Sequence, residues 1–203
     1  MLRSGLVRYS LVGFTALWVL AVGFSLLKLL DYSNTPSLGA APPTIWPESS
    51  TLVKQRGRLT AVMLAHPQCP CTRASIGELA IAAAQAAGRL DIYVVFLESP
   101  AFDLESDLWR SALEIPNTKV IADPDGAEIR RFGVKASGHT LVYDAAGRLV
   151  FSGGVVSARG HAGANRGREA IVALARHGRS SVTSSPVFGC ALQSRDLPLA
   201  AAR

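Results

Sequence analysis

The stretch Leu59–Leu79, LTAVMLAHPQCPCTRASIGEL, determines the fold that we expect for this chain. Its first part, Leu59–Ala65, is a short apolar run and is typical of a buried strand. The run ends at His-Pro-Gln, and two cysteines follow, Cys69 and Cys71. From Thr72 onward, apolar residues recur at a spacing of three and four, which predicts a helix. A cysteine between a strand and a helix lies beside free backbone N–H groups and the positive end of the helix dipole, which favour a thiolate. The stretch therefore predicts redox or other thiol chemistry.

The composition predicts one ordinary domain with an attachment that contacts lipid. The chain has 203 residues, of which 49% are hydrophobic, and its mean hydropathy is +0.25. The net charge of +6 is scattered, without a run of like charges or a basic patch interleaved with aromatic residues, and this argues against nucleic-acid binding. Three cysteines do not form a disulfide framework, and two of them lie one residue apart. That spacing suggests reactivity or metal binding rather than stapling.

The N-terminal segment predicts a single membrane span. No charged residue occurs from Tyr9 to Leu27, and about 19 residues at 1.5 Å each give roughly 28 Å, enough to cross a bilayer core. We expect membrane attachment through residues 9–30, with Lys28 at the far interface. The basic residues Arg3 and Arg8 precede the span, so the N-terminus is expected in the cytoplasm and the domain outside it, in the periplasm. A cleaved signal peptide, which shares this charge layout, is the alternative.

The rest of the chain divides into a tether, a domain and a C-terminal part. Residues 1–31 form the anchor, and residues 32–50 are rich in Pro, Ser and Ala, as in an extended tether. Residues 51–156 carry alternating strand and helix patterns, and residues 157–203 add a loop, a helix and a tail with Cys190. After the opening strand and helix, we expect a strand at 90–97, a helix at 105–113, a strand at 119–122, a short helix at 127–132, a hairpin of strands 139–143 and 148–151, and a helix at 165–176. This order predicts an α/β fold of the thioredoxin-like class, a central mixed sheet flanked by helices.

Two motifs resemble those of membrane-anchored, extracytoplasmic thioredoxin-like proteins of the TlpA/ResA type, especially proteins labelled RedB. The first is Cys69-Pro70-Cys71-Thr72-Arg73-Ala74 with Glu78-Leu79 further on, where the family usually has C-P-P-C-R-A and then E-L. The second runs from Phe132-Gly133-Val134 through Gly138-His139-Thr140 to Tyr143-Asp144, Gly147-Arg148-Leu149-Val150 and Gly153. The resemblance covers residues 50–156. It places Cys69 at the family's exposed nucleophile, Thr72 at its resolving cysteine, and His139 at its proline beside the active-site sulfurs.

The resemblance implies a thiol-disulfide oxidoreductase that needs no cofactor and acts on a protein thiol or disulfide partner. Cys69 would attack the partner's disulfide, and Cys71 or Cys190 would resolve the mixed disulfide, because Thr72 cannot. A disulfide between Cys69 and Cys71 would close a very small, strained ring. A bond from Cys190 to either cysteine would be a long-range staple, and a purely structural staple is the alternative interpretation.

Other functions stay open at this stage. His139 could tune the pKa of Cys69, could join Cys69 and Cys71 as ligands of copper in the manner of the Sco proteins of the same superfamily, or could simply fill the space of the proline. A peroxiredoxin-like peroxidase is less favoured, because His66 stands where that family has its threonine. An inert binding module is a further alternative.

The loop at residues 157–168, SARGHAGANRGR, is cationic and rich in Gly and Ala. It could cover the active site or bind an acidic partner, but a solvated surface loop is the preferred interpretation. Asn165 is expected to cap the helix that follows.

Overall fold

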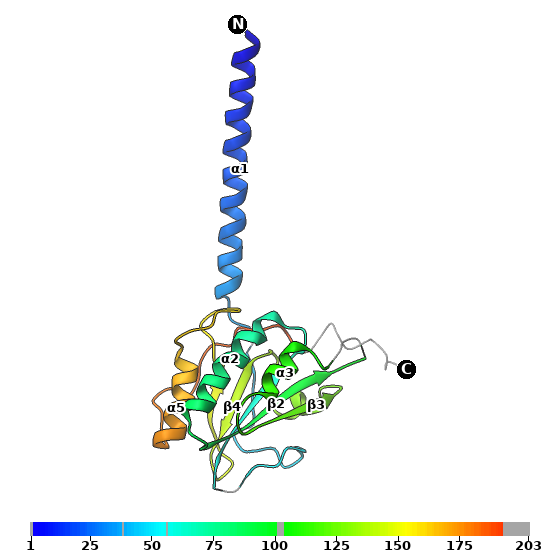
Figure 1. The fold of residues 1–203 in the computed structure, drawn as a ribbon, viewed down its shortest axis with the longest axis vertical. Coiled ribbons are helices and arrows are strands. Elements are labelled where there is room, and N and C mark those ends of the chain that lie inside the picture. Colours follow the sequence, from blue (N-terminus) through cyan, green and yellow to red (C-terminus); the bar gives the residue numbers. More distant parts are fainter. Residues whose placement is uncertain (1, 38, 56, 101–103, 193–203) are drawn as a thin grey trace. The chain divides into compact units, whose positions relative to one another are not determined.

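The computed structural model describes residues 2–37, 39–55, 57–100 and 104–192. The chain forms two compact units, one comprising Met1–Thr35 and the other beginning at Pro36. The first unit is the single helix α1, and the second contains the sheet and the other helices (Figure 1).

Helix α1, Leu2–Asn34, meets the length and composition required of a membrane span. Its apolar part, Leu11–Asn34, has 24 residues and a mean hydropathy of 1.9, and none of it is buried within the protein. At 1.5 Å per residue, this part is about 36 Å long, against a hydrocarbon core of about 30 Å. Large side chains such as Phe14 and Trp18 are more than half exposed along it. An apolar surface of this kind is stable when lipid covers it.

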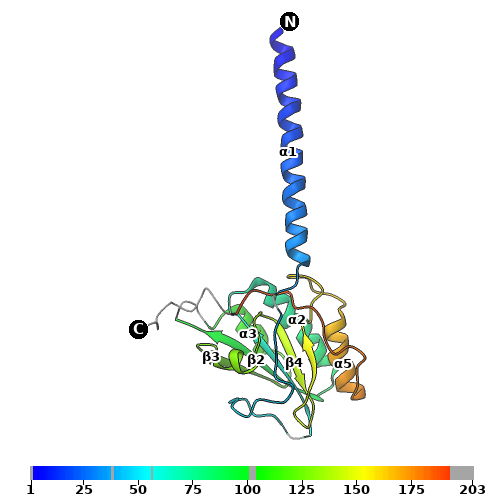
Figure 2. The same cartoon turned by 180° about the vertical axis from the view of Figure 1, so that it is seen from behind.

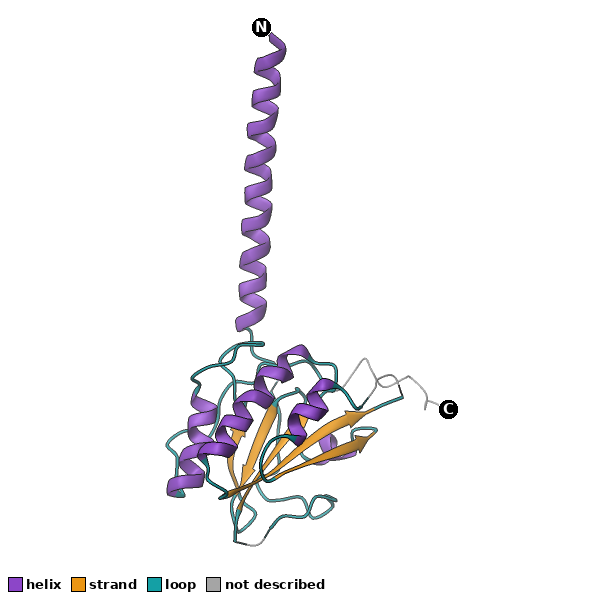
Figure 3. Ribbon diagram, viewed as in Figure 1, coloured by secondary structure: helices purple, strands orange, loops and turns teal. Residues whose placement is uncertain are grey.

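The second unit is built on a five-stranded mixed sheet with the strand order β3-β2-β1-β4-β5 (Figure 3). The strands are β1 Leu59–Ala65, β2 Leu90–Glu98, β3 Thr118–Pro124, β4 His139–Tyr143 and β5 Leu149–Gly153. β1 pairs in parallel with β2, as β2 does with β3, whereas β4 is antiparallel to both β1 and β5. β1 lies in the middle of the sheet, so its apolar residues are needed on both faces.

Alternate residues of β1 pack against different layers. Ala61, Met63 and Ala65 contact the side covered by α2 Pro70–Gln85, α3 Asp107–Leu113 and α5 Arg166–His177, which lie together in both ribbon views (Figures 1 and 2). Val62 and Leu64 face the other core, which contains side chains of α4 Ala127–Arg131 and of the segment before β1. The side-chain period of two along a strand therefore produces a three-layer domain.

The predicted thioredoxin-like fold is confirmed, with small changes at element ends. β1 and β4 have the expected bounds, and α2 begins at Pro70 rather than at Thr72. Proline suits the first turn of a helix because its missing N–H would have no intrahelical partner there. Cys69 is consequently the N-cap of α2, and Cys71 lies within its first turn.

The segment after α5 returns along the sheet rather than leaving the domain. Ser152 in β5 donates its N–H to the carbonyl of Thr183, and Ser152 and Ser184 form a parallel bridge. Further on, Ala191 forms an antiparallel bridge with Ala136, in the loop before β4. This path brings the third cysteine, Cys190, to the start of α2.

Candidate thiol site

Cys69 lies where β1 gives way to α2. Its backbone is extended, with φ −81° and ψ 112°, and its N–H donates to the carbonyl of His66 at 3.2 Å. The side chain makes no capping hydrogen bond to the helix and is only 1% exposed. The strand-to-helix junction thus places the sulfur beside the N-terminus of a helix, as the sequence predicted, but the sulfur is buried, whereas the resemblance implied an exposed nucleophile.

Cys190 is the nearest cysteine to Cys69. The two Sγ atoms are 2.7 Å apart, although 121 positions separate the residues in sequence. The backbone on both sides of Cys190 is held by the loop before β4, since Ser137 N–H donates to Cys190 O at 2.8 Å and Leu192 N–H donates to Lys135 O at 2.9 Å. The tertiary fold therefore brings these two sulfurs together.

Cys71 completes a cluster of three thiols. The three sulfur atoms lie within 4.8 Å of one another, and all three cysteines are free. Cys69 is buried, whereas Cys71 and Cys190 are partly exposed. Soft thiolates at this spacing are also the ligands that Cu(I) prefers.

The cluster gives its members opposite acidities. A hydrogen bond from the Cys190 thiol, helped by Thr72, outweighs burial and lowers the pKa of Cys69 to about 4. The same hydrogen bond, together with burial, raises the pKa of Cys190. Burial and the negative charge of Cys69 raise the pKa of Cys71, and Arg159 opposes that rise. Cys69 is thus the thiolate of the group, and thiolates are the nucleophiles of disulfide exchange.

Thr72 is hydrogen-bonded to Cys69 and belongs to a buried polar chain. Its Oγ1 is 2.5 Å from Oγ of Ser137, and Ser137 Oγ accepts the backbone N–H of His66 at 2.8 Å. The hydroxyl of Thr72 also helps to hold the pKa of Cys69 low. A hydroxyl at this position can stabilise a thiolate but cannot form a disulfide.

His139 is buried at the start of β4, and its Nε2 is 2.8 Å from Oγ of Ser152. Burial lowers the pKa of His139 to about 4, so the ring is neutral at neutral pH. Among the residues that the structure describes, the group of possible metal ligands contains Cys190 and does not contain His139. The proposed roles of His139, as a copper ligand or as the group that tunes the pKa of Cys69, stay predictions.

Arg159 and Ser37 contribute to the site although the sequence did not single them out. Nη1 of Arg159 donates to the carbonyl of Gly189 at 2.6 Å, next to Cys190. Ser37 holds the same glycine, since its Oγ donates to Gly189 O at 2.7 Å and accepts Gly189 N–H at 2.9 Å. The cationic loop predicted Arg159 only as one of four basic residues, and much of that loop is exposed as expected. Nothing in the sequence of the tether indicates Ser37.

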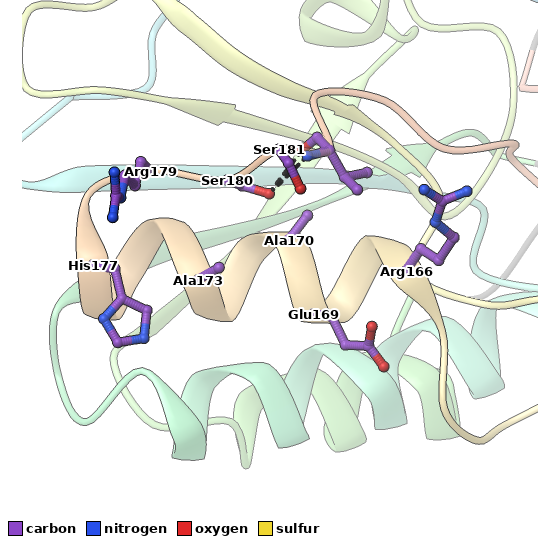
Figure 4. Close-up of a pocket in the computed structure, with 9 residues that line it drawn as sticks. Arg166, Glu169, Ala170, Ala173, His177, Arg179, Ser180 and Ser181 are labelled. Carbon is purple, nitrogen blue, oxygen red and sulfur yellow. Dashed lines mark hydrogen bonds between the residues drawn. The ribbon is translucent and has the colours of Figure 1, made fainter.

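A separate hollow of about 860 Å³ lies between α5 and the segment that follows it (Figure 4). Its lining is polar and basic in part, with Arg166, Glu169, His177 and Arg179 around the small side chains Ala170 and Ala173. Ser180 holds the segment's turn by donating to the carbonyl of Val182 at 3.0 Å. None of the lining residues is a cysteine, so this hollow is separate from the cluster of three thiols.

Comparisons with known proteins find similar solved structures. No family model matches the chain, and no curated protein matches it either. A hypothetical protein from Sinorhizobium meliloti 1021 is 21% identical, covering 78% of this chain and 95% of its own, with a TM-score of 0.55. An uncharacterised conserved protein from Geobacillus kaustophilus is 16% identical, covering 80% and 95%, also with a TM-score of 0.55. An exposed lipoprotein thioredoxin from Streptococcus pneumoniae is 20% identical over 60% of this chain and 85% of its own, with a TM-score of 0.43.

The class of protein follows from the sheet order and the helices that flank it. This chain has a thioredoxin-like fold, with a cluster of three cysteines at the start of α2 and one N-terminal apolar helix. The resemblance seen in the sequence is confirmed at the level of the fold, and the RedB-like subtype stays a prediction.

Proposed function

We propose that this protein is a membrane-anchored thiol-disulfide oxidoreductase in which Cys69 is the nucleophile and Cys190 the resolving thiol. The observation that carries the proposal is the 2.7 Å approach of the Cys190 sulfur to Cys69 at the N-terminus of α2. The low pKa of Cys69 supports it, because a thiolate is present at neutral pH.

The reaction is written for a partner that brings a disulfide. The Cys69 thiolate attacks one sulfur of that disulfide, and a mixed disulfide forms while the partner's second sulfur leaves as a thiolate. Cys190 then attacks Sγ of Cys69, passing its proton to the departing partner sulfur. The sulfur that left first as a thiolate takes its proton from solvent, so the partner gains two electrons and becomes a dithiol, and Cys69 and Cys190 become a disulfide. The same steps run in reverse when a dithiol partner meets the oxidised protein.

The charge distribution favours this sequence of steps. The hydrogen bond with Cys69 and its negative charge hold the pKa of Cys190 high. Once Cys69 has entered a mixed disulfide, its sulfur carries no charge, and this contribution disappears. Cys190 is thereby activated after the first step and not before it.

The helix α1 supports attachment of the domain to the outer face of the cytoplasmic membrane. Its apolar part is long enough to span the bilayer, and Arg3 and Arg8 precede it in the sequence. The excess of basic residues on that side favours a cytoplasmic N-terminus and a domain in the periplasm, where disulfides persist.

The test uses the full chain in detergent with a disulfide-bonded protein such as insulin as the substrate. Cys190→Ser should accumulate a mixed disulfide at Cys69, and Cys71→Ser, the matched control, should turn over and retain a bond between Cys69 and Cys190 by mass mapping. A native bond between Cys69 and Cys71, or a trapped complex in Cys71→Ser alone, would contradict the proposal.

The same three thiols support a second candidate, the binding or delivery of copper. Soft thiolates suit Cu(I), and the sulfur atoms lie within 4.8 Å of one another. A further arm of the experiment titrates the reduced chain with Cu(I) in the absence of oxygen. Loss of uptake in both Cys71→Ser and Cys190→Ser supports a three-thiolate site, and loss in His139→Ala instead of Cys190→Ser supports the set Cys69, Cys71 and His139. No uptake by the unaltered chain excludes both.

A further inference from the structure

The end of the described chain, residues 185–192, is held against the domain by backbone hydrogen bonds and one β-bridge, and we call it the C-terminal segment. Its backbone pairs with the loop 135–137 through Cys190 and Leu192, which surround the bridge between Ala136 and Ala191. Ser37 N–H also donates to the carbonyl of Val187 at 2.8 Å, and Ser37 and Arg159 together hold Gly189. Most of these contacts use backbone groups of the segment.

The C-terminal segment covers the reactive sulfur. Cys69 is 1% exposed, and the Cys190 side chain lies directly against it. Exchange requires a partner sulfur to approach Sγ along the line of the bond that will break. With the segment in place, Cys190 occupies the approach to Cys69, so a partner cannot reach that sulfur.

Gly189 shows how closely the segment fits. A Cβ added there would lie 1.8 Å from the carbonyl oxygen of Ser137, and real Cβ atoms do not approach a backbone oxygen so closely. The backbone of Gly189 is not in the left-handed region, so the requirement for glycine comes from space and not from conformation. A side chain at this position must push the segment away from the loop.

We propose that the C-terminal segment is a removable internal competitor for the partner, and that an extended, cysteine-bearing segment of the partner takes its place on the loop 135–137 until Cys190 returns to attack the mixed disulfide. The inference rests on the proposed function in one respect, that Cys69 is the thiol that reacts. The loop offers the N–H of Ser137 and the carbonyl of Lys135, which pair with any extended backbone. The side chains of Val187 and Phe188 are buried, so apolar residues just before the partner's cysteine would suit the same place.

Tethering makes the competition strong. A segment linked to the domain binds with an effective concentration that reaches the millimolar range for short flexible links, so a free peptide at micromolar concentration displaces it poorly. Undocking of the segment is therefore expected to limit the rate at which Cys69 meets a partner.

The test uses the full chain in detergent with Cys69 as its single thiol, in the variant Cys71→Ser/Cys190→Ser. This background forms no disulfide, so it separates coverage of Cys69 from the redox function. Gly189→Val is then added, and the rate of Cys69 alkylation by iodoacetamide is measured up to the alkaline plateau, where the thiolate is complete in every variant. Gly39→Ala is the control, because a Cβ there meets no atom within 4 Å.

We expect Gly189→Val to raise the plateau rate at least tenfold and Gly39→Ala to leave it unchanged. An equal plateau rate in the folded Gly189→Val protein would overturn the proposal. Ser37→Ala removes the hydroxyl that holds Gly189 and gives the same comparison if Gly189→Val does not fold.

A peptide probe tests the place of the partner. A peptide with the sequence of residues 186–192, PVFGCAL, carries its cysteine as an activated disulfide with nitrothiobenzoate. The control peptide has N-methylleucine in place of its last leucine and therefore lacks the N–H that would donate to Lys135 O. The unmodified peptide should react with Cys69 of the Gly189→Val chain several-fold faster than this control. Equal rates for the two peptides would show that the loop does not hold the partner. Failure of the proposed function would appear separately, as the absence of a bond between Cys69 and Cys190 in the unaltered protein.

Discussion

Thr72 and His139 occupy the two positions at which this chain departs from the family that its sequence resembles. In the structure both side chains are buried, and each lies next to a serine hydroxyl. Thr72 contributes to the low pKa of Cys69, whereas Nε2 of His139 is hydrogen-bonded with the hydroxyl of Ser152. Their positions in the sequence indicated that they lie near the site, but their hydrogen-bond partners could be identified only from the tertiary structure.

His139 is expected to make stability depend on pH. Its pKa of about 4 in the folded protein lies below the ordinary value of 6.5. Between these values the unfolded chain binds a proton that the folded chain does not, so stability is lost as pH falls from about 6.5 towards 4. We expect a loss of about 2 kcal/mol between pH 7 and pH 5 from this group alone. Urea denaturation at both pH values measures it, and His139→Gln should reduce the difference by about that amount; an unchanged difference would contradict the assignment.

Helix α2 connects the thiol site to the rest of the domain. Cys69 is its N-cap and Cys71 lies in its first turn. Further along, the buried Glu78 accepts hydrogen bonds from Gly163 N at 2.7 Å and from Asn165 Nδ2 at 3.1 Å. Glu78 also pairs with Arg168 at 2.5 Å. One carboxylate on α2 thus fixes the end of the loop that bears Arg159 and the first turn of α5.

Removal of the Glu78 carboxylate should destabilise this junction strongly. Glu78→Ala leaves Arg168, whose side chain is 16% exposed, without its partner, and breaking a partly buried pair in this way costs about 3 kcal/mol. Chemical denaturation of the full chain in detergent measures the change. Glu169→Ala, an exposed carboxylate in the first turn of α5, is the control and should change stability by less than about 0.5 kcal/mol. Similar costs for the two variants would refute the proposed importance of the buried pair.

At the scale of the whole molecule, the chain consists of an apolar helix and a domain with its own two-sided core. The exposed apolar side chains of α1 predict membrane attachment, and the folded unit begins at Pro36. The three thiols all belong to that second unit. The orientation of α1 in the membrane therefore decides on which side of the membrane the proposed chemistry takes place.

Orientation can be measured with Cys71 as the single thiol, in Cys69→Ser/Cys190→Ser. Cys71 is partly exposed, so a membrane-impermeant maleimide should label it in intact spheroplasts of a bacterial host. Labelling only after lysis would place the domain in the cytoplasm and contradict the proposed location. The full chain should stay with the membrane fraction after carbonate extraction, and a chain that begins at Pro36 should be released.

The sequence by itself determined most of the strands and helices of the domain and the position of Cys69 between β1 and α2. The apolar run of β1, the helical spacing of α2 after Thr72 and the hairpin of β4 and β5 are local patterns, and each can be identified from neighbouring residues alone. Cys69 follows from the same local reasoning, because a strand-to-helix junction is defined by a few residues.

The closeness of Cys190 to Cys69, and the approach of Arg159 and Ser37, were decided only by the tertiary structure. These residues lie in segments without periodic hydrophobicity, and 121 positions separate the two cysteines. The sequence left both Cys71 and Cys190 as candidate resolving thiols, because spacing along the chain does not give the tertiary position of the C-terminal segment. Backbone hydrogen bonds to the loop 135–137 and the absence of a side chain at Gly189 bring Cys190 to the sulfur of Cys69, and both depend on surfaces that exist only after the sheet has formed.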